Sequence, residues 1–160
     1  MQTPEPLPPY RPEPEQGRPP RQAPRTLVPG YWGERLAWVS GLVLALSAFT
    51  GWYSGTQADG LTLSVLGWHT GSLGKLVFFI GLAALILEAL REAGIELPAT
   101  VPESLVLIAL GSLATIFVLI RIISIPDAFF FASRGVGIWI SLIAAVGVIA
   151  AGLLQVSEEL

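Results

Sequence analysis

Four long apolar blocks, separated by short polar segments, dominate the pattern of this chain. They cover residues 36–54, 73–91, 101–125 and 135–155. Each is close to the ~20 residues that a helix needs to cross the hydrocarbon core of a bilayer. In lipid, every backbone N–H and C=O group must bond within the protein, which favours helices. The pattern therefore predicts an all-α fold, an integral membrane four-helix bundle over residues 31–156.

The two ends of the chain are different. Ten of the 13 prolines lie within the first 30 residues, together with four of the eight arginines. Proline at this density excludes regular helix and sheet, so residues 1–30 are predicted to be a disordered Pro/Arg-rich cytoplasmic tail. Such a tail suits an aromatic groove on a partner protein, or anionic lipid through its arginines. Residues 157–160 are expected to form a short C-terminal tail.

Local signals support the block boundaries. Thr100 and Glu103 have the spacing of a capping box, and Pro102 lies in the first turn, where a helix needs no N–H donor. Pro126 is expected to end the third helix at about Ile125. Between the first two blocks, "LTLSV" alternates apolar and polar residues. This alternation is compatible with a short strand or with a segment lying on the membrane interface.

Composition excludes several classes of protein. Only 13% of residues are charged, 52% are hydrophobic, and the net charge is −3. There is no basic excess, so we expect no nucleic-acid partner. The absence of cysteine and the presence of one histidine exclude thiolate chemistry and a histidine metal cluster within one chain. No phosphate-binding loop or HExxH motif is present. We therefore expect no enzyme, no metal and no cofactor.

The distribution of basic and aromatic residues predicts the orientation. Lysines and arginines near the block ends number five on the amino-terminal side and three on the opposite side. This excess favours both termini in the cytoplasm of a multi-pass plasma-membrane protein. Tryptophans near the block ends are expected to act as interface anchors: Trp32, Trp38, Trp52, Trp68 and Trp139.

A few ionisable residues within or beside the apolar blocks are candidate ligand or ion sites: Lys75, Glu88, Arg121 and Arg134. Glu88 is either a proton or cation site or, as the default, the partner of Arg91 in an interfacial salt bridge. Arg121 lies about 30 Å along its helix from Val101, taking ~1.5 Å per residue. It therefore marks the membrane boundary and snorkels, or it is a buried charge that pairs with Asp127 or Asp59. Lys75 is expected to snorkel.

Small residues recur four apart on two blocks and predict helix-packing seams. The first seam is Ala37, Gly41 and Ala45, and the second is Gly137, Ser141 and Ala145. Such seams let helix backbones approach closely in lipid. They serve packing within one bundle or, alternatively, contact between subunits.

The outer segment 54–72 holds the single histidine. His69 with Asp59 and Ser72 has the residue types of a nucleophile system, but no accompanying motif is present. We interpret His69 as a solvated loop residue.

Several motifs resemble those of small, largely uncharacterised four-span membrane proteins common in actinobacteria. They are the Pro-rich tail, "FTGWYSG", "LGWHTG", "RIISIP" and "RGVGIWISLIAA". The resemblance extends over about Gly30 to Leu154. It implies the four-span topology and a bacterial plasma membrane, and no activity.

Two functions follow as hypotheses. The first is a small membrane scaffold or accessory subunit of the cell envelope, which acts through helix–helix and tail contacts. The alternative is an oligomeric transporter or channel component with Lys75, Glu88 and Arg121 facing a lumen.

Overall fold

A computed structural model describes residues 30–56, 60–95, 101–124 and 133–159 of the 160-residue chain. The predictions for the Pro-rich tail before Gly30, and those that involve Asp59, Thr100, Pro126 and Asp127, lie outside these residues.

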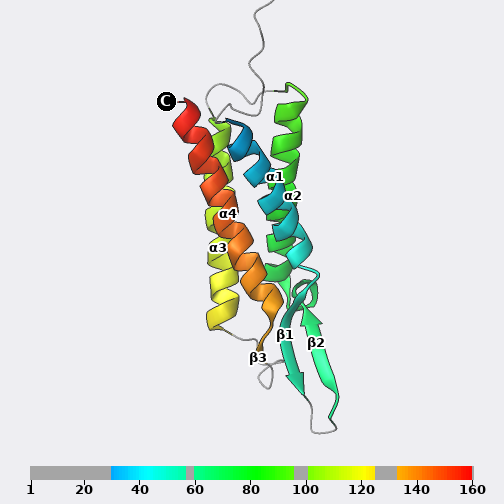
Figure 1. The fold of residues 1–160 in the computed structure, drawn as a ribbon. Coiled ribbons are helices and arrows are strands. Elements are labelled where there is room, and N and C mark those ends of the chain that lie inside the picture. The colour runs from blue at the N-terminus through cyan, green and yellow to red at the C-terminus, as the bar shows by residue number, and fades with distance from the viewer. Residues whose placement is uncertain (1–29, 57–59, 96–100, 125–132, 160) are drawn as a thin grey trace, which may run out of the picture.

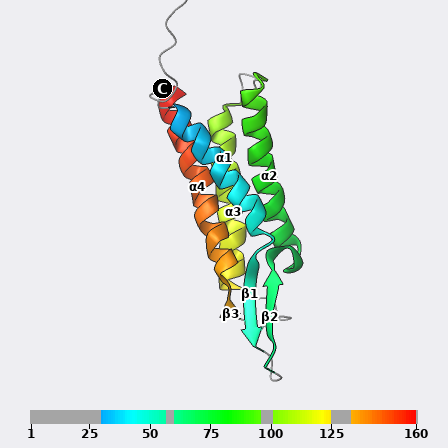
Figure 2. The ribbon, with the colours of Figure 1, turned by 45° about the vertical axis from the view of Figure 1, so that its right-hand side comes forward.

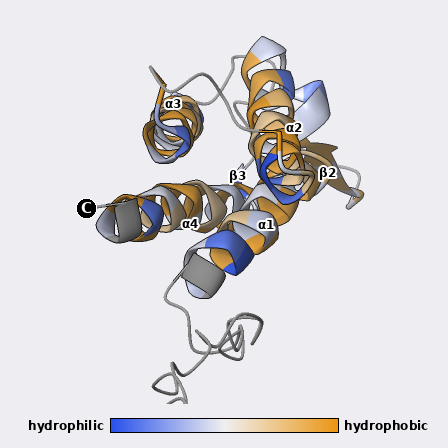
Figure 3. Cartoon of the chain, turned by 90° about the horizontal axis from the view of Figure 1, so that it is seen from above, coloured by the Kyte–Doolittle hydropathy of each residue, from blue (hydrophilic) through white to orange (hydrophobic). Residues whose placement is uncertain are grey.

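Four helices lie along one another in an elongated antiparallel bundle (Figure 1). Helix α1 packs against α2 and α4, and α3 packs against α4 and α2, so that α2 and α4 stand diagonally (Figure 3). The helices span Gly30–Ser47 (α1), Ser72–Glu92 (α2), Glu103–Ile123 (α3) and Val136–Glu159 (α4). Helices α2, α3 and α4 are each long and apolar enough to cross a membrane.

A small antiparallel sheet projects from one end of the bundle (Figures 1 and 2). Its strand order is β2-β1-β3, with β1 at Gly51–Thr56, β2 at Thr62–Leu66 and β3 at Ser133–Arg134. A short 3-10 turn, η2 at Gly67–His69, leads from β2 into α2. The strand alternative for "LTLSV" is thus confirmed. The all-α prediction holds for the bundle and is wrong for this sheet.

The first helix ends earlier than its apolar block predicts. Helix α1 stops at Ser47, whereas the prediction placed the helix at 36–54. Trp52 and Tyr53 belong instead to β1, where both side chains are fully buried. The indole of Trp52 turns back under the bundle, and its Nε1 donates to the carbonyl of Ser47, 2.9 Å away. A run of apolar residues indicates that the side chains are buried, but not in which secondary structure. Here the side chains of Trp52 and Tyr53 are buried against the end of the bundle, in a strand.

The other helix boundaries differ by a few residues. Helix α3 begins at Glu103 with Pro102 as its N-cap, rather than at 101 with Pro102 in its first turn, and it ends at Ile123 rather than at 125. Helix α2 spans 72–92 rather than 73–91. Helix α4 continues to Glu159, so most of the predicted tail at 157–160 is helical.

The bundle interior is lined mainly by small side chains, and large apolar side chains cover its outside. In α3 the buried positions follow a 3,4 spacing along one face: Ser104, Leu107, Gly111, Ala114 and Val118. The opposite face exposes Leu105, Leu113, Ile116 and Leu119. Apolar residues therefore extend around most of each helix (Figure 3). This arrangement is typical of helices that face lipid outside and each other inside.

Candidate functional site

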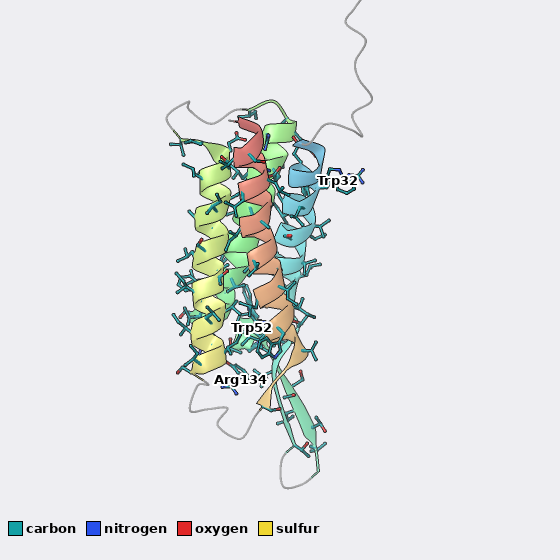
Figure 4. All side chains as sticks on the ribbon, turned by 60° about the vertical axis from the view of Figure 1, so that its left-hand side comes forward. Trp32, Trp52 and Arg134 are labelled. Atoms are coloured by element: carbon teal, nitrogen blue, oxygen red, sulfur yellow. The ribbon has the colours of Figure 1, made fainter. Side chains whose placement is uncertain are left out.

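Polar side chains gather at the two ends of the bundle. One group surrounds Glu88, where α1 begins and α4 ends, and we call this the Glu88 end. The other surrounds Arg121 and Arg134, where the sheet is attached, and we call this the sheet end. Figure 4 shows Arg134 there. Between them the helices make apolar and small-residue contacts.

Glu88 pairs with a residue that the sequence analysis missed. Its side chain is 2% exposed, and its Oε1 accepts a hydrogen bond of 2.8 Å from Nε2 of Gln155, which is 1% exposed. The contact runs from α2 across the bundle diagonal to α4. The predicted salt bridge between Glu88 and Arg91 is therefore wrong. The sequence feature that could have identified Gln155 is its polar amide side chain, which directly follows an uncharged apolar block.

Arg91 instead connects the two helices that flank α2. Its Nε lies 3.7 Å from Oε1 of Glu34 in α1 and 3.8 Å from Oε2 of Glu103 in α3. These carboxylates take up its charge, because guanidinium and carboxylate attract at this range. Nearby, Nε1 of Trp38 donates to Oε1 of Glu92, 3.0 Å away, which closes the contact between α1 and α2.

The Glu88 end also holds polar atoms that lack partners. Among the described residues, four buried side-chain atoms have no hydrogen bond, and three of them are at this end: Glu88 Oε2, Gln155 Oε1 and Arg91 Nη1. Buried polar atoms in proteins nearly always form hydrogen bonds. A cluster of buried polar atoms without partners therefore marks a place where further hydrogen bonds could form.

At the sheet end, side chains from β1 and β3 cap α3. The last carbonyls of a helix have no partner within it. The hydroxyl of Tyr53 donates to the carbonyl of Arg121 at 2.8 Å, and Nε of Arg134 donates to the carbonyl of Ile122 at 2.6 Å. Tyr53 and Arg134 are direct partners in the β1–β3 register. The strand pair therefore presents two donors to the end of one helix.

Arg121 lies at the helix end, as predicted, but it does not simply snorkel. Its side chain is half-buried, and Nη2 donates to the carbonyl of Thr70 in the turn before α2. Gly71, with φ of +109°, leaves room for this guanidinium, because a Cβ there would lie 2.8 Å from Nη2. Arg121 thus joins α3 to the start of α2.

The environment of Tyr53 changes its acidity. Burial raises the pKa of this phenol above its ordinary value of 10.0, and the positive charges of Arg121 and Arg134 partly oppose that effect. Desolvation disfavours the charged phenolate, whereas nearby cations favour it. The net result is a phenol that stays neutral and able to donate its hydrogen bond.

Lys75 stands over an aromatic cluster at the sheet end. Its Nζ is 5.6 Å from the ring centre of Trp68, a cation–π distance. Trp68 in turn stacks on Phe49 and meets Phe78 edge-on. Lys75, Arg121 and Arg134 therefore share one end of the bundle, and Glu88 lies at the other. His69 is exposed in η2, and its predicted partner Asp59 lies outside the described residues.

The tryptophans divide into exposed and buried members. Trp32 is 65% exposed on the outer side of α1 (Figure 4). Trp139 is 48% exposed on α4, and both exposures are as expected for anchors at a membrane interface. Trp38 and Trp68 are half-buried. Trp52 is fully buried where β1 meets the bundle, so the prediction that it is an interface anchor is wrong.

Both predicted seams face the inside of the bundle. Ala37, Gly41 and Ala45 are buried, and a Cβ on Gly41 would lie 3.4 Å from Leu85 of α2. On α4, Gly137 packs against Thr50, and Oγ of Ser141 lies 2.8 Å from Oγ of Ser47. Ala145 is fully buried. In the described structure, the residues of both seams therefore mediate helix packing within one chain.

Two further features bear on binding. A polar hollow of about 260 Å³ lies on the sheet, lined by Ser54, Gly55, Thr56, Thr62 and Ser133. Among the described residues, no group of three or more His, Cys, Asp or Glu side chains could hold a metal ion.

Comparison with protein-family models, curated proteins and solved structures found no match to this chain. Its function is therefore inferred from the geometry above.

Proposed function

We propose that this protein is a small integral membrane scaffold or accessory subunit of the bacterial cell envelope. In this proposal α1 is a fourth span, both termini are cytoplasmic, and the sheet lies on the outer side of the plasma membrane. The sheet then presents a fixed binding edge to a partner protein.

The observation that carries the proposal is a sheet firmly attached to the bundle with one edge strand open. Attachment comes from Tyr53 and Arg134 on α3, from Trp52 on α1, and from the backbone N–H of Gly135, which donates to the carbonyl of Trp52 at 2.7 Å. Strand β2 is at the edge of the sheet and pairs only with β1 among the described residues. A rigidly held edge is a ready template for another strand.

The open edge lacks the features that usually protect one. Strand β2 and the residue before it, "LTLSVL", contain no charge and no proline. Leu61 is 64% exposed and Leu63 is 44% exposed. Proteins commonly protect exposed edges with lysine, proline or a covering segment. We therefore take the occupant of this edge to be an extended, largely uncharged strand of a partner membrane protein.

The interior of the bundle supports a scaffold rather than a conduit. A Cβ on Gly81 would lie 2.6 Å from the backbone N of Ala45, and one on Gly111 would lie 2.9 Å from the backbone N of Ile149. Helices this close leave no room for an aqueous path between them. Lys75 and Arg121 also lie at the opposite end from Glu88, so one chain does not present them to a common lumen.

The proposal is tested by photo-crosslinking from the edge strand in native membranes. A photoreactive residue replaces Leu63, and the control replaces Ile143, which is 73% exposed on the outer face of α4. We expect a defined partner, stoichiometric after mild-detergent purification, to be cross-linked from position 63 and not from position 143. The variant Leu63→Lys should release the partner, because a charge protects an edge, whereas Leu63→Thr should retain it.

A deletion of residues 1–29 separates the contribution of the tail. If Leu63→Lys and the deletion both left every co-purifying protein in place, the scaffold proposal would be rejected. A pure homo-oligomer without a partner would instead favour the transport alternative. Flux through vesicles with Lys75, Glu88 and Arg121 each replaced by glutamine would then be the next measurement.

A further inference from the structure

A buried carboxyl–amide pair crosses the centre of the Glu88 end. Glu88 and Gln155 are 2% and 1% exposed, and they come from helices that stand diagonally in the bundle. One hydrogen bond of 2.8 Å already joins them, from Gln155 Nε2 to Glu88 Oε1. Each residue also has one buried oxygen without a partner, Oε2 of Glu88 and Oε1 of Gln155.

Neither of the two unpartnered oxygens can donate a hydrogen bond when Glu88 is ionised. An ionised carboxylate carries no hydrogen and only accepts, and the oxygen of an amide also only accepts. With Glu88 ionised, neither oxygen can bond to the other, and both stay unsatisfied in the protein interior. A single proton on Oε2 changes this, because a carboxylic acid is one donor as well as an acceptor.

We propose that Glu88 is a proton-binding site. The proton resides on Oε2 and is donated to Oε1 of Gln155, while Nε2 of Gln155 donates to Oε1 of Glu88. The two side chains then form a reciprocal ring of two hydrogen bonds. One proton satisfies both unpartnered oxygens and removes a buried charge that has no ion pair among the described residues. This inference goes beyond the proposed function and does not depend on it.

The charged neighbours of Glu88 are consistent with a neutral acid. On α1 the nearest charged group is Glu34, on α2 it is Arg91, and on α3 it is Glu103. The described side chain that α4 contributes is the neutral Gln155. The Nε of Arg91 lies beside Glu34 and Glu103, and its buried Nη1 makes no hydrogen bond to Glu88. Among the described residues Glu88 has no ion pair, which a buried carboxylate would require.

A metal cation does not fit this place as well as a proton. Calcium takes about six to eight oxygen ligands, and magnesium requires a nearly ideal octahedron. Glu88 and Gln155 supply two unpartnered oxygens, and the guanidinium of Arg91 stands beside them. A proton needs only one donor position and one acceptor.

The proposed proton has a structural consequence. The ring connects α2 to α4 across the diagonal, whereas the main helix–helix packing of the described bundle joins neighbours. Loss of the proton leaves one hydrogen bond and a buried negative charge. The Glu88 end should then open or hydrate, so that proton release and movement of α4 against α2 are coupled.

The proposal is tested by infrared difference spectroscopy on the full-length protein in lipid vesicles at neutral pH. We expect wild-type protein to show the C=O stretching band of a protonated carboxylic acid, and Glu88→Gln to lack it. Glu92→Gln is the matched control, because Glu92 is an exposed glutamate four residues along α2, and it should retain the band. Gln155→Leu should shift the band to the frequency of a free acid or abolish it.

A second measurement applies if Glu88→Gln does not fold. Wild-type protein labelled with ¹³C at the glutamate carboxyl groups should show the acid band at its isotope-shifted frequency, and the band should disappear at alkaline pH. An acid band that is absent from labelled wild-type protein, or that is unchanged in Glu88→Gln or Gln155→Leu, would overturn the proposal.

Discussion

The hydroxyl of Tyr53 donates a hydrogen bond to the backbone carbonyl of Arg121, 68 residues along the chain and 2.8 Å away. This contact fixes the sheet to the last turn of α3. Because the carbonyls at a helix end have no intrahelical partner, the bond also caps the helix. Arg134, paired with Tyr53 in the sheet, caps the next carbonyl. The sheet and the helix end therefore stabilise each other.

Removing the hydroxyl should measure the strength of this attachment. We expect Tyr53→Phe to lower the free energy of unfolding by about 1 kcal/mol, the typical net value of one buried hydrogen bond. Tyr53→Ala also removes a fully buried ring and should cost about 3–5 kcal/mol. Equilibrium unfolding in mixed detergent micelles would measure both. An unchanged free energy of unfolding for Tyr53→Phe would show that the hydroxyl bond contributes nothing.

The raised pKa of Tyr53 predicts a loss of stability in alkali. The folded protein holds this proton more tightly than the unfolded chain, so the stabilisation is fully present below pH 10. It should be lost as the pH rises through 10 and beyond, toward the higher folded pKa. In a variant with Tyr10→Phe and Tyr31→Phe, ultraviolet absorbance would follow Tyr53 alone. A midpoint at or below 10 would contradict the prediction.

Two glycines at the contact between α1 and α2 should respond differently to alanine. A Cβ on Gly81 would lie 2.6 Å from the backbone N of Ala45, which cannot move without shifting α1, so Gly81→Ala should cost about 1–3 kcal/mol. A Cβ on Gly41 meets the flexible side chain of Leu85 at 3.4 Å. Gly41→Ala should be neutral or stabilising by up to ~1 kcal/mol, because alanine favours helix. Thermal unfolding of both variants would decide; equal effects would contradict this packing.

The proposed four-span topology is testable because the chain has no cysteine. Single cysteines at Ser54 and Ser157 stand at opposite ends of the bundle. In intact cells, a membrane-impermeant maleimide should label Ser54→Cys and leave Ser157→Cys unlabelled until the membrane is opened. A third cysteine at Glu34, near the start of α1, should behave like the one at Ser157. Labelling of Glu34→Cys in intact cells would show that α1 does not cross the membrane.

The apolar blocks predicted the helices well because burial in a bundle and exposure to lipid both require apolar residues. Because buried strands are apolar as well, the apolar pattern did not reveal that α1 ends at Ser47 and that β1 follows. Trp52 and Tyr53 continue an apolar run, yet they belong to β1, which pairs with β2 in a hairpin and also with β3, about 80 residues away. Pairing at that distance leaves no local pattern. The alternation in "LTLSV" was the one local signal of the sheet, because β2 forms its pairs within a hairpin.

The polar contacts were harder to predict than the fold. Glu88 was recognised as unusual, and its nearest basic residue along the helix, Arg91, was the natural partner. In the structure, Arg91 forms ion pairs with Glu34 and Glu103. Glu88 instead accepts a hydrogen bond from Gln155. The rule of residues three or four apart describes an isolated helix. In this bundle, side chains from other helices approach Arg91 and Glu88 instead, and their positions depend on helix rotation, which a sequence pattern does not determine.

The position of β3 has a consequence for biosynthesis. Strand β3 completes the sheet, but its two residues lie just before α4 and are synthesised after α1, α2 and α3. Until then β1 is paired with β2 alone, and its other edge is open. During this interval the carbonyls at the end of α3 also lack Arg134. The sheet end of the nascent protein therefore stays incomplete until α1, α2 and α3 have been synthesised and β3 follows them.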